Sequence, residues 1–492
     1  MHLPTKRTII ALSTLLIFAG CADLAPFTST SKTSGSTIAN VTPYTDPTGI
    51  IATYTTAGSI DTSGPFFQTL GANQRTCATC HQADQAMSIN TATTLSLFNS
   101  TSGTDPLFTA VDGANCPTAT TGNAAQHSLI LNNGLIRVAV ELPAGTQFTL
   151  TLLSDPYGCA LTLDPTTGRQ IVSTYRRPLP TSSLTYLSNV MWDTRETIDP
   201  LSSNNTFSSS LTADLTQQML DAVTNHEQGA TAPTSTQIAA VLAFEQGLFT
   251  AQATDNAAGS LSANNATGGP ADLAAVTFYP GINDAFGGDP TGAAFNPTNV
   301  FALYANWNGP NASAAQASIF RGEKLFNTAP LKITDVSGIN NNTSLNSPAN
   351  VQGSCTTCHD TPSIGNHSLP LPLDTGIAHD TAVETDPNIN AALGALSLPS
   401  LPIYQITGCK DANNKPVTYT TTDPGKGLFT GLCSDVNRVK VPILRGLAAR
   451  APYFHNGSAA SIAQVVAFYN ARFQMGLAPQ QQTDLINFLN AL

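Results

Sequence analysis

The pattern C-x-x-C-H occurs twice, at residues 77–81 and 355–359, and it constrains the chain more than any other feature. This spacing lets two thiols add to the two vinyl groups of one porphyrin, while the adjacent histidine ligates the iron. Zinc is a poor alternative, because each motif offers only three ligands and no second cysteine pair lies nearby. We therefore predict two covalent c-type haems. The thiols are Cys77, Cys80, Cys355 and Cys358, and the ligating imidazoles belong to His81 and His359.

Four further cysteines follow the first motif or the second: Cys116, Cys159, Cys409 and Cys433. Four cysteines allow three connectivities. In an oxidising compartment outside the cytoplasm, pairing within each half of the chain is the simplest arrangement. We favour Cys116 with Cys159 and Cys409 with Cys433, both as structural bonds.

The N-terminus has the pattern of an export signal. Lys6 and Arg7 precede an apolar run over residues 9–18 that is too short to span a bilayer. The run ends in Phe-Ala-Gly-Cys, which resembles the bacterial lipoprotein signal with Cys21 as the lipidated residue. We predict a signal peptide over residues 1–20 and a flexible tether over residues 21–63, rich in Thr, Ser, Gly and Pro. The protein would then be held by lipid on a membrane, in the periplasm or at the cell surface.

Length and periodicity predict a mainly α fold with two cytochrome c-like domains. The chain has 492 residues, more than one domain usually holds, and the two haem motifs lie far apart. We place an N-terminal domain at residues 64–312 and a C-terminal domain at residues 313–492. The net charge of −11 makes nucleic acid an improbable partner.

Apolar residues at helical spacing predict helices at residues 211–224, 235–251, 313–326 and 480–492. Residues 135–142 and 147–152 alternate like strands, and Pro143-Ala144-Gly145 between them favours a hairpin turn. We expect a small β-rich insertion, over residues of about 100–175, within the N-terminal domain.

Two stretches carry a family resemblance. Residues 441–446 read VPILRG and residues 451–458 read APYFHNGS, while residues 176–180 and 191–195 read RRPLP and MWDTR. Together with the two haem motifs, these stretches resemble the dihaem cytochrome c peroxidases and their MauG-type relatives. The resemblance covers most of residues 64–492.

The resemblance implies roles for three residues. His81 would be the proximal ligand of the N-terminal haem, where the family binds peroxide. His359 would be proximal to the C-terminal haem, which accepts electrons and passes them inward. Trp192 matches a tryptophan between the haems that shortens the path for electron transfer; its alternative role is a large core aromatic.

The distal ligand of the C-terminal haem departs from the peroxidase pattern. In the peroxidases a methionine lies fourteen residues beyond the histidine of P-Y-F-H, and here that position is Tyr469, as in MauG. A phenolate is a hard anionic donor that favours higher iron oxidation states. Met475 could ligate instead, or Tyr469 could be only a buried aromatic.

The acid–base position departs as well. The family uses a glutamate to move the proton of bound peroxide, and the matching position is Gln228, whose amide cannot do so. Glu227 or His226 could serve after a shift of one or two residues, or the segment could be a solvated helix end.

The resemblance also implies an interdomain Ca²⁺ ion. The matching positions hold Arg177 and Arg450, which are poor neighbours for a divalent cation, so the sequence argues against this site. His367 and His379 follow the second motif, and we interpret both as exposed loop histidines rather than distal ligands.

The resemblance therefore predicts an exported peroxidase. It would reduce hydrogen peroxide with electrons from a small cytochrome c or a copper protein of the cupredoxin type. Two alternatives remain: a MauG-like oxidase of another protein or small molecule, and a lipid-anchored electron carrier without turnover.

Overall fold

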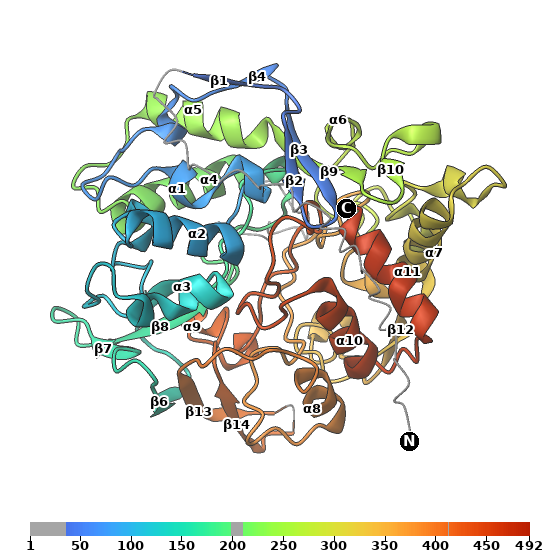
Figure 1. The fold of residues 1–492 in the computed structure, drawn as a ribbon. Coiled ribbons are helices and arrows are strands. Elements are labelled where there is room, and N and C mark those ends of the chain that lie inside the picture. Colours follow the sequence, from blue (N-terminus) through green and yellow to red (C-terminus); the bar gives the residue numbers. More distant parts are fainter. Residues whose placement is uncertain (1–35, 198–209, 412) are drawn as a thin grey trace, which may run out of the picture. The chain divides into compact units, whose positions relative to one another are not determined.

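The computed structural model describes residues 36–197, 210–411 and 413–492, all of which belong to one compact unit (Figure 1). The helices are α1 Cys77–Cys80, α2 Thr91–Thr101, α3 Ser128–Asn133, α4 Leu211–Asp221, α5 Ser235–Gln246, α6 Pro270–Leu273, α7 Ala314–Thr328, α8 Pro387–Leu393, α9 Gly427–Thr430, α10 Ile462–Arg472 and α11 Pro479–Asn490. The strands are β1 Thr37–Ala39, β2 Pro43–Asp46, β3 Gly49–Thr55, β4 Ser59–Asp61, β5 Ile136–Glu141, β6 Thr149–Ser154, β7 Leu161–Leu163, β8 Gln170–Arg176, β9 Leu248–Asp255, β10 Gly259–Ser260, β11 Leu331–Ile333, β12 Val351–Gly353, β13 Ile403–Lys410 and β14 Pro416–Thr421. The signal peptide and Cys21 lie outside the described residues.

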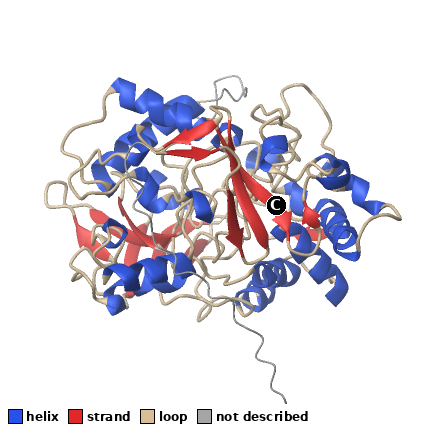
Figure 2. Ribbon diagram, turned by 45° about the horizontal axis from the view of Figure 1, so that its top comes forward, coloured by secondary structure: helices blue, strands red, loops and turns tan. Residues whose placement is uncertain are grey.

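The strands form several small sheets among the helices (Figure 2). The four-stranded sheet has the order β10-β9-β3-β2, and β3 pairs antiparallel with β9. Two three-stranded sheets have the orders β5-β8-β7 and β14-β13-β6. The described residues therefore mix helices with sheets, and a mainly α fold is not confirmed; the domain boundary at residues 312 and 313 stays a prediction.

The prediction of a flexible tether is wrong for residues 37–61, which contain strands β1 to β4. Ser, Thr and Gly suggested a linker, but β3 contains Ile50, Ile51 and Thr53, which suit a strand that is buried between two neighbours. Ile51 is fully buried against β9, so this segment is part of the core.

The predicted hairpin is also wrong. Both strands exist, as β5 and β6, but they do not pair with each other. β5 pairs with β8, whereas β6 pairs with β13, which is about 250 residues further along the chain. The β-rich segment is present, but one of its strands completes a sheet with the C-terminal half.

The predicted helices are present, with one shortened. α4, α7 and α11 lie within two or three residues of the expected ranges. The helix predicted over residues 235–251 ends at Gln246, because residues from Leu248 onward pair with β3 as β9. Tertiary pairing overrides the helical spacing there.

Each C-x-x-C-H motif packs against its own apolar cluster. Cys77 borders a cluster that includes Phe66, Leu184, Leu215 and Val241. Cys355 and Cys358 border a second cluster around Trp307, Phe326 and Phe488. In this second cluster α7 lies against α11 (Figure 1). Gly322 allows this close approach, because a Cβ atom at this position would lie only 2.0 Å from the Asp484 carbonyl oxygen.

Among the described residues, no helix is long and apolar enough to cross a membrane. The four remaining cysteines are paired as we favoured, Cys116 with Cys159 and Cys409 with Cys433. The four motif cysteines take part in no disulfide.

Candidate functional site

The first motif forms a single helical turn, α1, that presents two thiols and an imidazole together. Thr76 caps the turn and the His81 amide donates to the Cys77 carbonyl at 3.1 Å, so the histidine follows directly on the turn. The Nδ1 atom of His81 is 3.1 Å from the Met87 carbonyl oxygen. With Nδ1–H donating to this oxygen, Nε2 keeps a free lone pair for a metal. Burial lowers the pKa of His81 to about 4, which keeps the ring neutral.

A cavity opens beside this motif. Its walls are largely apolar, with Leu184, Leu187, Val190, Leu215, Met219 and Val223 among them. Cys77, Cys80 and His81 form one side, and Arg195 and Lys440 contribute cationic groups. Burial lowers the pKa of Lys440 to about 7, so this ammonium would gain from an anionic neighbour.

This lining fits a haem. The thiols suit the vinyl groups, the free imidazole nitrogen suits the iron, the apolar walls suit the macrocycle, and the cations suit the propionates. His81, Cys77 and Cys80 would hold the group.

Two buried carboxylates face the same cavity. Glu227 accepts a hydrogen bond from the Leu70 amide at 2.9 Å, and its other oxygen lies 3.9 Å from the Cys77 Sγ atom. Glu245, on α5, is 4% exposed, and its Oε2 atom has no hydrogen-bond partner. Burial raises the pKa of Glu227, and it raises the pKa of Glu245 to about 8. Glu245 can therefore hold a proton near neutral pH.

Gln228, the residue that matches the glutamate of the peroxidases, does not line this cavity. Gln228 is exposed and has a φ of 56°, which lies in the left-handed region. His226 and Glu227 do line the cavity, and the Nδ1 atom of His226 lies 2.5 Å from Asp112. Of the three residues that the sequence offered for the acid–base role, His226 and Glu227 therefore line the cavity and Gln228 does not.

Glu245 was missed because it lies in the apolar stripe of a core helix. Ile238, Val241, Leu242 and Glu245 share one face of α5, at spacings of three, four and seven residues. A carboxylate in such a stripe is the signal that would have identified it.

Trp192 lies in the cavity wall and is held rigidly. Its indole N–H donates to the Arg177 carbonyl at 2.8 Å, and its ring lies 6.0 Å from the His455 ring. The next residue, Asp193, accepts from Arg176 at 2.5 Å and from Arg195 at 3.0 Å. Although burial raises it, the pKa of Asp193 stays well below its usual range because of these two guanidinium groups.

The second motif repeats the local design of the first. Ser354 caps the turn, and Nδ1 of His359 faces the Gly365 carbonyl oxygen, which again leaves Nε2 free. Burial lowers the pKa of His359 to about 4. Apolar contacts and the same trio of thiols and imidazole fit a haem here too, held by Cys355, Cys358 and His359.

Tyr469 lies next to this motif. The pKa of its phenol is raised, mainly by burial. Cys358 and Cys355 raise this pKa further, so both thiols are close enough to act on the phenol electrostatically. Its ring stacks on Phe473 at 5.9 Å. Met475 is buried in the apolar cluster that Tyr469 borders. A buried phenolate is costly unless a cation lies beside it. Tyr469 would therefore be ionised only when it ligates the iron.

The remaining predicted positions behave differently from expectation. The interpretation of His367 as an exposed histidine is wrong, because its side chain is 3% exposed between Asp284 and Asp360. His379 is 19% exposed and pairs with Asp374 and Glu384. Exposure was inferred from the loop setting, but nearby carboxylates hold both rings inside.

The two arginines at the calcium positions are buried. Arg177 donates to the carbonyl oxygens of Gly134 and Arg450, and Arg450 donates to that of Ile443. Burial, together with the adjacent Arg450 guanidinium, lowers the pKa of Arg177 to about 9. Backbone oxygens of this region are thus used by guanidinium groups.

Comparisons with known proteins agree with the haem-binding character of these sites. No family model matches the chain. Cytochrome-c peroxidase IdrP1 of Denitromonas iodatirespirans is 34% identical over 107 residues, which is 18% of this chain and 28% of that relative. Cytochrome-c peroxidase IdrP2 of the same organism is 29% identical over 148 residues, 29% of this chain and 36% of that relative. The chain thus matches only about a third of either relative's length.

Both relatives are named as cytochrome-c peroxidases. Over these matched segments the chain is similar to cytochrome-c peroxidases, as its motifs indicated. A solved structure of a MauG-like protein associated with microbial copper homeostasis is 14% identical, over 68% of this chain and 79% of its own. Its TM-score of 0.28 is too low to inform the fold.

Proposed function

We propose that this protein is a peroxidase that reduces hydrogen peroxide at the His81 site with electrons that enter through the His359 site. The observation that carries the proposal is the cavity beside His81, where two buried carboxylates and Trp192 face a space suited to a haem. When bound there, the haem supplies the iron at which peroxide binds and is reduced.

The carboxylates supply the proton chemistry. Heterolysis of peroxide needs a group that takes a proton from one oxygen and returns it to the other. Glu245, with its pKa of about 8, carries a proton at neutral pH and would give a proton to the departing oxygen, while Glu227, whose Oε1 atom lies 3.9 Å from the Cys77 Sγ atom, would take the proton from the bound one. The apolar walls limit access of bulk water, which strengthens electrostatic interactions inside the cavity.

The wall between the two sites supports transfer of electrons. Ile443 lines the His81 cavity, and the next residue, Leu444, packs on the cluster around the second motif. The Leu444 amide donates a hydrogen bond of 3.1 Å to the carbonyl oxygen of Ile364, a residue five positions beyond His359. Trp192 lines the same cavity and offers an aromatic step on this short route.

Export, the lipid anchor and the electron donor are part of the same proposal. Cys21 would carry the lipid and hold the protein on a membrane in the periplasm or at the cell surface. Two disulfides suit an oxidising compartment. The donor would be a small cytochrome c or a cupredoxin.

A MauG-like oxidase is the second candidate, and the position of Tyr469 favours it. Tyr469 packs against the same apolar cluster as Cys355 and Cys358 of the second motif, and a phenolate ligand there would stabilise oxidised iron. Such an enzyme would withdraw electrons from another protein or small molecule through Trp192.

One experiment separates the candidates. Haem content is measured first, with two covalent haems per chain expected, and stopped-flow spectroscopy then follows peroxide with and without a reduced cytochrome c. Repeated turnover with the cytochrome supports the peroxidase. A persistent oxidised state that does not turn over supports the oxidase, and a spectrum that peroxide leaves unchanged contradicts both.

A further inference from the structure

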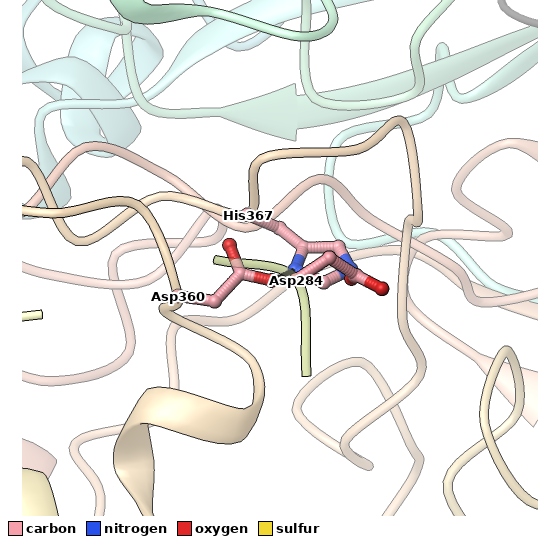
Figure 3. A group of neighbouring side chains, drawn as sticks. All are labelled: Asp284, Asp360 and His367. Carbon is pink, nitrogen blue, oxygen red and sulfur yellow. Dashed lines mark ion pairs between the residues drawn. The ribbon is translucent and has the colours of Figure 1, made fainter. Parts of the chain in front are cut away.

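A buried histidine lies between two aspartates at a place that the proposed peroxide chemistry does not use. Asp284, Asp360 and His367 are each at most 3% exposed at the side chain, and their ligand atoms lie within 4.8 Å of one another. Figure 3 shows the two carboxyl groups converging on the imidazole ring. Asp360 follows His359 directly, whereas Asp284 comes from the loop that precedes α7.

Each carboxylate is oriented by the backbone and keeps one oxygen for the ring. Oδ2 of Asp284 accepts from the amides of Phe286 and Gly288, at 3.0 and 2.6 Å. Oδ1 of Asp360 accepts from the Ser368 amide at 2.6 Å. The other oxygen of each carboxylate faces the ring of His367. Oδ1 of Asp284 lies 3.8 Å from Nε2, and Oδ2 of Asp360 lies 2.6 Å from Nδ1. Such support is typical of metal-binding carboxylates.

None of these facing atoms has a well-aligned hydrogen bond, although Nδ1 of His367 and Oδ2 of Asp360 form an ion pair. Both ring nitrogens of His367 and both facing carboxylate oxygens are buried without a hydrogen-bond partner. Even the short contact between Nδ1 and Asp360 is therefore poorly aligned for an N–H donor. Leaving four buried polar atoms unpaired is costly, and a bound ion would satisfy them.

The charge count points the same way. Two carboxylates and one imidazole carry a net negative charge even when the imidazole is protonated. Among the described residues, no lysine or arginine forms an ion pair with Asp284 or Asp360. Burial of an uncompensated charge costs several kcal/mol, and a divalent cation would remove that cost.

A second group in the same molecule shows what a satisfied triad looks like. His379 lies between Glu384 and Asp374, and its Nδ1 and Nε2 atoms lie 2.5 and 3.0 Å from their oxygens in well-aligned hydrogen bonds. Burial lowers the pKa of His379, but Asp374 and Glu384 outweigh it and raise the pKa to about 10. This group is an imidazolium between two carboxylates and has no need of a metal.

We propose that Asp284, Asp360 and His367 bind one divalent first-row transition-metal ion of the Zn²⁺ or Mn²⁺ type. One nitrogen and two carboxylate oxygens suit such an ion, with water at the remaining positions. Ca²⁺ is a poorer match, because it takes six to eight oxygen ligands. The ion would tie the loop around Asp284 to the turn that follows His359.

Metal analysis of the haem-loaded protein tests the site without peroxide, so its outcome is independent of the proposed function. The protein is treated with dipicolinate, which leaves haem iron in place, and is then titrated with Zn²⁺ alone and with Mn²⁺ alone. We expect about one equivalent of either ion to bind. Asp284→Asn and His367→Gln should weaken binding at least ~100-fold, because each removes a ligand.

His379→Gln is the matched control and should bind the ion like the parent protein. If a variant does not fold, thermal unfolding of the parent decides the question: dipicolinate should lower its midpoint, and Zn²⁺ or Mn²⁺ should restore it. The proposal is overturned if the parent binds neither ion, or if Asp284→Asn binds it as tightly as His379→Gln does.

Discussion

The surroundings of the two C-x-x-C-H motifs differ in one respect that matters for chemistry. Both motifs leave the Nε2 atom of a neutral histidine free, and both pack partly buried thiols against apolar residues. The first borders a cavity with Glu227 and Glu245 in its wall. The second lies against the aromatic rings of Tyr469 and Phe326.

The difference separates two tasks. A reaction that moves protons needs acids within reach of an open space, whereas electron transfer needs only a rigid, dry setting with both iron positions filled. The same local sequence can thus serve both tasks, and the decisive residues come from distant parts of the chain: α5 for the first motif and α10 for the second.

Replacement of the two histidines should show the largest contrast. His81→Gly should abolish reaction with peroxide, because it removes the iron ligand at the cavity. His359→Gly should also stop steady-state turnover, since electrons no longer enter, but a single reaction of reduced protein with peroxide should persist. Stopped-flow spectroscopy distinguishes the two.

The opposite pattern, with single reactions lost only in His359→Gly, would reverse the assignment of tasks. Haem content of both variants is measured beforehand, so that loss of the cofactor is not mistaken for loss of reactivity.

Replacement of the cavity carboxylates should have the next largest effect. The double variant Glu227→Gln with Glu245→Gln should lower the turnover number by ~10²–10⁴-fold, the usual contribution of a positioned acid–base group. If Glu245 donates the proton, turnover of the parent falls as pH rises through about 8, where this group loses its proton. Glu245→Gln alone should remove that alkaline fall.

Glu323→Gln is the control for this pair. Glu323 is buried, and burial raises its pKa to about 7, but it accepts from the amides of Leu303 and Tyr304 and is not part of the cavity. An unchanged pH profile in Glu245→Gln, or an equal loss in Glu323→Gln, would remove Glu245 from the reaction.

The features that the sequence predicts well are local. The spacing of two cysteines and a histidine defines each motif, and pairing within each half of the chain favours Cys116 with Cys159 and Cys409 with Cys433. Helical spacing identifies α7 and α11, because their apolar faces repeat along a continuous segment.

The features that it misses depend on distant partners. β6 follows β5 closely, yet it pairs with β13, and nothing in residues 143–154 indicates that choice. Composition suggested a tether where β3 is buried against β9. Glu245 has the spacing of a core residue, and only the cavity beside it reveals its environment. Local spacing carries no information about which surface a segment will meet.

Tyr469→Phe should change the second motif while leaving peroxide binding at the first intact. If the phenolate ligates iron, low-temperature EPR of the oxidised protein should lose the signal of that haem and gain another. Met475→Leu should leave the spectrum unchanged. An unchanged spectrum in Tyr469→Phe together with a changed one in Met475→Leu would assign the ligand to Met475.

Glu245→Gln should also stabilise the protein at alkaline pH, which is an independent check on the cavity. The folded-state pKa of Glu245, about 8, lies above the value of about 4.3 expected for an unfolded chain, so the folded state binds more protons between these values. The stability of the parent therefore falls as pH rises from about 4.3 to about 8 and then levels off. The amide of the Glu245→Gln variant has no proton to lose over this range.

The gain in unfolding free energy of this variant should therefore be near zero at pH 4 and grow to roughly 5 kcal/mol at most by pH 8. Urea unfolding of both proteins across this range measures it. Because Glu323 also has a raised pKa, of about 7, Glu323→Gln should gain less over the same range, and it loses two hydrogen bonds from backbone amides. A gain that does not depend on pH would mean that Glu245 is ionised inside the folded protein. An ionised Glu245 has no proton to supply, so it could not act as the acid in peroxide reduction.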